Sequence, residues 1–135
     1  MAPNKFQSNE TSDKIDQQNE LTVQIVDFAD KKVVFIRFDG EIDTTFDVKA
    51  PDSRVMFELV SNPEMEDFMV EKQCLIGNNT EVKLSVVINQ VAKLLYGRGE
   101  TRNLVISLSS KIFARDDGKD FDKIIMVLNL LKQLT

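Results

Sequence analysis

At 135 residues and 42% apolar content, the chain has the size and composition of one globular domain with a substantial core. It contains no histidine, which excludes Ser-His-Asp and Cys-His catalysis and removes the commonest metal ligand. The net charge of −5 argues against a nucleic-acid partner. Cys74 is the single cysteine, and no apolar run suits a membrane span or a secretory signal, so we expect a cytoplasmic or nuclear protein.

The first residues are mostly Asn, Gln, Ser, Asp and Lys, with little that could pack into a core. We predict a disordered tail over residues 1–19 and a single folded domain over residues 20–135. The alternative is that Phe6 or Ile15 caps the core.

Strand-like alternation of apolar and polar residues recurs along the chain. The first two such segments flank the turn sequence ADKK and are expected to form a hairpin. In the fourth, Val55, Phe57 and Leu59 alternate as on one face of a strand. The expected strands cover residues 21–28, 33–39, 42–48, 54–61, 68–76 and 102–110.

The clearest helix follows Gly77. Asn79 or Thr80 can cap it, Glu81 suits its first turn, and Gly97 or Gly99 ends it. Its apolar side chains recur at helical spacing, and they are Leu84, Val87, Ile88, Val91, Leu94 and Leu95.

A second helix is expected over residues 121–134, with Asp120 as its N-cap. Its predicted inner stripe is Phe121, Ile124, Ile125, Leu128 and Leu131. Further apolar residues widen this stripe beyond that of an ordinary surface helix. The order of elements predicts an α+β fold, with a mainly antiparallel sheet and two helices on one face.

Motifs that could carry chemistry do not fit their requirements. Gly77 stands alone, and the charge of Glu81 would repel a phosphate, so we interpret the segment as a structural turn. FDGEID (residues 38–43) does not place its residues in the register of a calcium-binding loop. Glu41 and Asp43 are two carboxylates of the kind a glycosidase uses, but the sequence does not show the distance between them. We expect no cofactor and no metal. Charged residues near loop ends are interpreted as a solvated rim, and they are Arg98, Arg102, Arg115, Asp116 and Asp117.

The sheet face opposite the helices is expected to be unusual, because it mixes Phe, Val and Met with Arg, Glu and Ser. Protein interfaces have this character, with an apolar centre and a polar rim. The alternative is a third layer formed by residues 62–72. The candidate interface residues are Val26, Phe28, Val33, Phe35, Arg37, Met56 and Val60.

Several segments together resemble the proteasome assembly chaperone 3/4 family. They are CLIG, the helix LSVVINQVAKLL, the strand RNLVISLSS and the C-terminal helix, and the likeness covers about residues 55–134. The start LTVQIVDF and the spacing from RVMFELV to LIG are more similar to the chaperone 4 branch. The polar tail and the acidic stretch over residues 39–52 depart from the family pattern.

The resemblance implies a non-enzymatic chaperone of the 20S proteasome with an antiparallel sheet and flanking helices. It implies pairing through the sheets with a sister chaperone of the chaperone 3 type, and binding of proteasome α-subunits, notably the α5 subunit, during assembly of the α-ring. A small dimeric signalling or trafficking adaptor is the alternative. An enzyme that uses carboxylates such as Glu41 and Asp43 is a third class.

Overall fold

The computed structural model describes residues 7–15, 18–77, 82–114 and 118–135. The strands are β1 (Gln7–Lys14), β2 (Glu20–Asp27), β3 (Lys31–Phe38), β4 (Thr44–Lys49), β5 (Glu71–Ile76) and β6 (Asn103–Leu108). The helices are α1 (Ser53–Ser61), α2 (Val82–Gly97) and α3 (Asp120–Leu134), with a short 3-10 helix, η1, at Ser110–Phe113.

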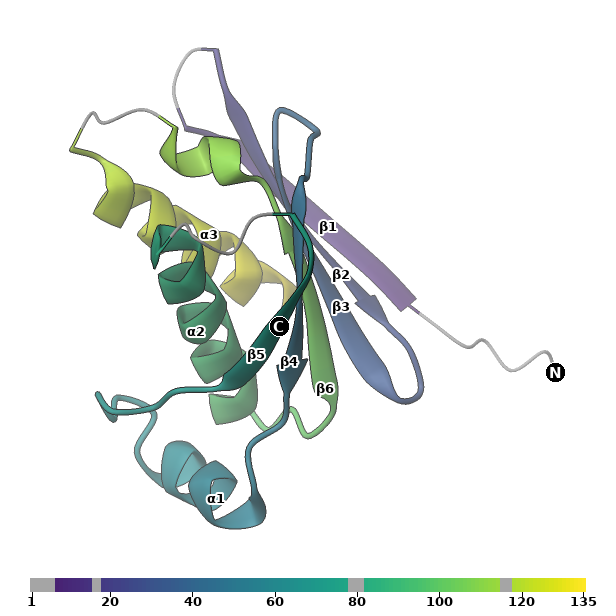
Figure 1. Ribbon diagram of the computed structural model, residues 1–135, viewed down its shortest axis with the longest axis vertical. Coiled ribbons are helices and arrows are strands. Elements are labelled where there is room, and N and C mark those ends of the chain that lie inside the picture. The colour runs from purple at the N-terminus through teal and green to yellow at the C-terminus, as the bar shows by residue number, and fades with distance from the viewer. Residues whose placement is uncertain (1–6, 16–17, 78–81, 115–117) are drawn as a thin grey trace, which may run out of the picture.

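The six strands form one sheet in the order β1-β2-β3-β6-β4-β5, and the helices lie on one side of it (Figure 1). Neighbouring strands are antiparallel except β3 and β6, which are parallel. The predicted α+β class and the mainly antiparallel sheet are confirmed, and the predicted hairpin is β2–β3.

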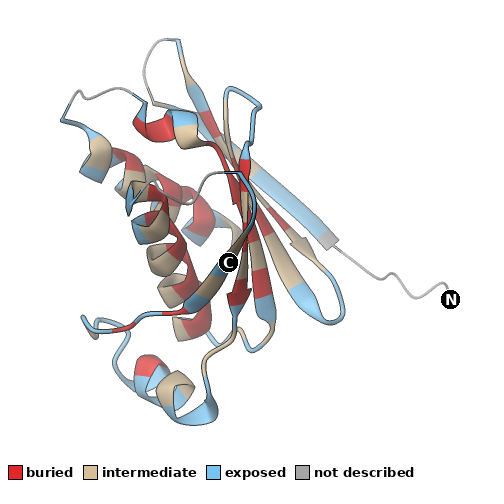
Figure 2. Cartoon of the chain, viewed as in Figure 1, coloured by how far each residue is buried: buried red, intermediate tan, exposed pale blue. Residues whose placement is uncertain are grey.

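The core lies between the helices and the inner face of the sheet, where the buried residues of both layers meet (Figure 2). Alternation places every second side chain of a strand on this face. The apolar strand residues that are fully or nearly buried are Leu21, Val23, Ile25, Val34, Ile36, Phe46, Val48, Leu104, Ile106 and Leu108.

Helix α2 follows the predicted pattern, because Leu84, Ile88 and Val91 lie one or two turns apart and are all buried. Tyr96 at its end is fully buried, and its hydroxyl donates to the carbonyl oxygen of Arg102 at 2.8 Å. Burial raises the pKa of this phenol, with Glu100 adding to the effect. The caps predicted at residues 79–81 lie outside the described residues.

Gly77 lies in a structural turn, and its close approach to the backbone of Asp43 and Thr44 explains why this residue is a glycine. Its φ is +94°, and a Cβ would lie 2.5 Å from the carbonyl oxygen of Asp43 and 2.9 Å from the Cα of Thr44. Any side chain would collide with the start of β4. The glycine therefore permits a close approach of two backbone segments.

The strand predicted over residues 54–61 is wrong, because this segment forms α1. The Asp52 carboxylate accepts from the backbone N–H of Val55 at 3.0 Å and caps the helix. Val55 and Leu59 lie one turn apart and face α2, whereas Phe57 is 73% exposed. The four-residue spacing of Val55 and Leu59 fits a helix as well as a strand, and the cap decides between the two.

The prediction of a disordered tail is wrong for residues 7–14, which form the edge strand β1. This strand pairs with β2 along its whole length, and Thr11 Oγ1 donates to Gln133 Oε1 of α3 at 2.9 Å. Backbone hydrogen bonds require no apolar side chains, and polar side chains are common on edge strands. Ile15 is half-buried against the core, as the alternative had it, whereas Phe6 lies outside the described residues.

The inner stripe predicted for α3 is rotated from the observed one. Phe121 and Ile125 are 71% and 39% exposed, and Leu128 is half-buried. The helix begins at Asp120, with Lys119 rather than Asp120 at the N-cap position. The residues that α3 buries are Lys123, Val127, Leu130 and Leu131. Because the helix is apolar nearly all round, spacing alone did not identify its buried side.

The segment after α1 does not form a third layer over the sheet. Phe68 and Val70 are buried on the helix side, where Asn89 of α2 holds both. The Asn89 amide donates to the carbonyl oxygen of Phe68 at 2.7 Å and accepts from the N–H of Val70 at 3.0 Å. The outer face of the sheet is therefore not covered by this segment.

Candidate protein interface

The outer face of the sheet carries an apolar centre formed by β2, β3 and β6. Val26, Val33 and Val105 lie side by side across these three strands, and Phe35 lies two residues along from Val33. All four side chains are partly exposed, and the helices lie on the opposite face (Figure 1). We call Val26, Val33, Phe35 and Val105 the outer-face patch.

Polar side chains hold the aromatic member of this patch in place. The Arg37 guanidinium lies 4.7 Å from the centre of the Phe35 ring, a cation–π distance. Arg37 Nη1 donates to Gln24 Oε1 at 2.8 Å, and Gln24 Nε2 donates to Ser8 Oγ at the same distance. On the other side, Thr45 Oγ1 and Ser107 Oγ share a 2.8 Å hydrogen bond. These contacts give the patch a satisfied polar rim.

The structure brings together four of the seven predicted interface residues: Val26, Val33, Phe35 and Arg37. Phe28 lies just beyond the end of β2, at the turn that connects β2 to β3, and is 38% exposed. Met56 and Val60 belong to α1, so their placement on the sheet face is wrong. Met56 and Val60 were placed on the sheet face because their segment was predicted to be a strand.

Ile76 is an outer-face residue that the sequence did not identify. It pairs with Thr45 across β4 and β5 and is 64% exposed. The register of these strands shifts between Thr45 and Phe46, and such a bulge changes which side chains share a face. Simple alternation along β5 could not reveal it.

A network of charges closes one end of the sheet. Arg102 donates through Nε and Nη2 to the two carboxylate oxygens of Glu100, both at 2.9 Å, and through Nη2 to Asp27 Oδ1 at 2.7 Å. Its Nη1 donates to the carbonyl oxygen of Phe28. Lys32 Nζ lies 3.2 Å from Glu100 Oε1 and 3.5 Å from Asp27 Oδ1. The network therefore ties the β2–β3 hairpin to the start of β6.

Glu100 is the most strongly perturbed carboxylate among the described residues. Burial disfavours its charged form, but hydrogen bonds from the Arg102 side chain and backbone, with those from Lys32, outweigh burial and lower its pKa from 4.5 to about 2. The hydrogen bond to Glu100 in turn raises the pKa of Arg102 further. The bidentate pair is thus ionised at neutral pH.

Glu100→Gln should destabilise the protein most above pH 4.5, because the depressed pKa means that the folded state favours the charged form. This contribution is complete above the unfolded pKa and is lost as the pH falls from 4.5 toward about 2. Urea unfolding of wild type and variant between neutral pH and pH of about 2 measures it. The exposed acid Glu66, changed to glutamine, is the control. A stability difference that does not shrink over this window would contradict the assignment.

The carboxylates considered as a glycosidase pair serve structural roles. Asp43 accepts from the backbone N–H and Oγ of Ser110 at 2.9 and 2.6 Å, and Glu41 accepts from Lys111 Nζ at 2.7 Å. Burial alone would raise the pKa of Asp43, but the bonds from Ser110 lower it overall. A general acid needs a raised pKa, so this pair does not have the electrostatics of a glycosidase site.

Other kinds of site find no support in the described residues. Among them, no three His, Cys, Asp or Glu residues are placed to hold a metal ion. None of their helices is long and apolar enough to cross a membrane. Of the predicted rim residues, Arg102 belongs to the charge network, and residues 115–117 lie outside the part of the chain that the structure describes.

Comparison with known proteins gives a match over nearly the whole chain. Residues 1–132 match the family described as 20S proteasome chaperone assembly proteins 3 and 4. A solved structure of "a Novel Chaperone Complex for Yeast 20S Proteasome Assembly" contains a similar chain, with 31% sequence identity and a TM-score of 0.69. The similarity covers 94% of this chain and 97% of the yeast chain. None of the curated proteins matches.

Proposed function

Because the chain belongs to the family of 20S proteasome chaperone assembly proteins 3 and 4, whose members are non-catalytic chaperones, we propose that it works as one half of a heterodimer. Its partner is a sister chaperone of the chaperone 3 type, and the chain itself represents the chaperone 4 branch. The pair binds α-subunits, in particular the α5 subunit, while the α-ring forms in the cytoplasm or nucleus.

The observation that supports pairing is the outer-face patch. An isolated domain that exposes Val26, Val33, Phe35 and Val105 together would tend to associate. The cation–π contact of Arg37 and the hydrogen bonds around the patch supply the polar rim that a protein interface needs. A second sheet can lie face to face on this surface, because stacked sheets bury alternate side chains from both strand layers.

Affinity purification of the tagged chain from its own cells tests this function. The expected result is recovery of a sister chaperone and proteasome α-subunits. Size-exclusion chromatography of the two recombinant chaperones should then show a one-to-one heterodimer. Recovery of membrane-trafficking proteins without α-subunits would instead favour the adaptor. A monomer that binds no sister chaperone would contradict the proposed pairing.

A further inference from the structure

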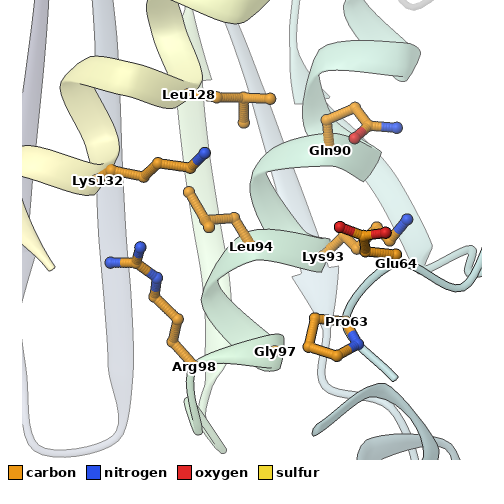
Figure 3. A pocket seen from close by; sticks show the side chains of 9 residues that line it. All are labelled: Pro63, Glu64, Gln90, Lys93, Leu94, Gly97, Arg98, Leu128 and Lys132. Carbon is orange, nitrogen blue, oxygen red and sulfur yellow. The ribbon is translucent and has the colours of Figure 1, made fainter. Parts of the chain in front are cut away.

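A groove of about 440 Å³ runs between α2 and α3, on the side of the molecule away from the sheet (Figure 3). The turn after α1 forms one wall of it, and the facing sides of the two helices form the rest. The residues that line it are Pro63, Glu64, Gln90, Lys93, Leu94, Gly97, Arg98, Leu128 and Lys132.

The two helices that form the groove are parallel and fixed at both ends. At their N-terminal ends, Lys83 Nζ lies 2.6 Å from Asp120 Oδ2. At their C-terminal ends, Arg98 Nη1 donates to Thr135 Oγ1 at 2.5 Å. Because both ends are bridged, the groove has a defined width before any partner binds, which lowers the entropic cost of binding.

The groove is basic, although the chain as a whole carries a net charge of −5. Among the described residues that line it, Lys93, Arg98 and Lys132 are accompanied by a single acid, Glu64. Within the described residues, neither Lys93 nor Lys132 forms an ion pair. Their charges are therefore available to an external carboxylate, in contrast to those of Arg102 and Lys32 in the charge network.

The groove continues into an apolar strip toward the N-terminal ends of the helices. Leu94 and Leu128, which line the groove, are half-buried. Val86 lies one turn before Gln90, and Ile125 one turn before Leu128, so helix geometry places both along the same seam. Val86 is 43% exposed, and Phe121, one further turn along α3, is 71% exposed. An occupant therefore meets apolar side chains at one end and basic side chains at the other.

We propose that this groove binds a segment of a proteasome α-subunit that carries carboxylates beside apolar side chains. The inference rests on the proposed function and adds to it the surface and the chemistry of α-subunit binding. Acidic groups of the segment pair with Lys93 and Lys132, and its apolar groups pack on Leu94 and Leu128. The groove and the outer-face patch belong to opposite sides of the domain, so a sister chaperone and an α-subunit can be bound at the same time.

The double variant Lys93→Glu/Lys132→Glu tests the proposal in the purified chaperone pair. Recombinant α-subunits, the α5 subunit first, are titrated onto the immobilised pair at low and high salt. We expect at least about tenfold weaker binding at low salt, because like charges brought together across an interface are repelled. Pairing with the sister chaperone should be unchanged. Arg54→Glu, at an exposed position on α1 outside both the groove and the sheet, is the charge-reversal control and should bind as wild type does.

Glu64→Gln tests the same charge argument in the opposite direction. It removes the one acid of the groove, so it should tighten binding of the α-subunit by about two- to fivefold. If the Lys93→Glu/Lys132→Glu and Glu64→Gln variants fold and bind the α-subunit with the affinity of wild type, the groove is not the binding surface. If the wild-type pair forms but binds no α-subunit, the proposed function itself fails, and the groove assignment fails with it.

Discussion

Phe35→Asp is expected to abolish pairing with the sister chaperone while leaving the domain folded. Phe35 lies on the outer face of β3, opposite Gln24 and Ser107, and outside the helix-covered core. In the heterodimer, a carboxylate at this position would be buried with no hydrogen-bond donor or positive charge to pair with. The ring of Phe35 would also be lost, and aromatic anchors commonly contribute at least about 2 kcal/mol to an interface. Size-exclusion chromatography with the sister chaperone measures pairing, and circular dichroism measures folding.

Phe57→Asp is the matched control for this experiment. Phe57 lies on α1 and is 73% exposed, so the same chemical change there should affect neither folding nor pairing. If Phe35→Asp unfolds the domain, Phe35 belongs to the core, contrary to the structure. If it folds and pairs as tightly as wild type, the sheet-face interface is refuted.

Ile88→Ala should lower the free energy of unfolding by about 2–5 kcal/mol, the range for large-to-small substitutions in a well-packed core. Ile88 is fully buried in the layer where α2 meets the inner face of the sheet, among residues such as Leu104 and Ile106. The loss combines the lost burial of the side chain with the cavity left behind. Chemical denaturation of the purified domain measures it.

Val86→Ala on the same helix is the control, because Val86 is largely outside the core. It should cost no more than about 0.5 kcal/mol, as most surface substitutions do. A cost for Ile88→Ala as small as this would show that α2 presents a different side to the sheet.

The elements predicted correctly are those whose side chains carry the signal. The β2–β3 hairpin and α2 alternate or repeat their apolar residues with the right period, and both are where the sequence indicates. The outer-face residues Val26, Val33, Phe35 and Arg37 follow from the same alternation.

The elements that were missed are specified by the backbone or by local capping. Strand β1 is stabilised by hydrogen bonds to β2, which leave no trace in side-chain type. In α1, Val55 and Leu59 fit both a strand and a helix, and only the Asp52 cap distinguishes them. The bulge between Thr45 and Phe46 that brings Ile76 to the outer face depends on the register between two strands.

The order of strands in the sheet has a consequence for synthesis of the chain on the ribosome. In the sheet that the structure describes, β1, β2 and β3 form one piece and β4 with β5 another, and β6 joins the two pieces. The edge of β3 away from β2 and the edge of β4 away from β5 both pair with β6. Because β6 spans Asn103–Leu108, these two edges have no partner strand until more than three-quarters of the 135 residues have been translated. Unpaired strand edges favour aggregation, and such long-range pairing is slow to form. A protein that assists the assembly of others thus passes through a nascent stage in which its own sheet is divided.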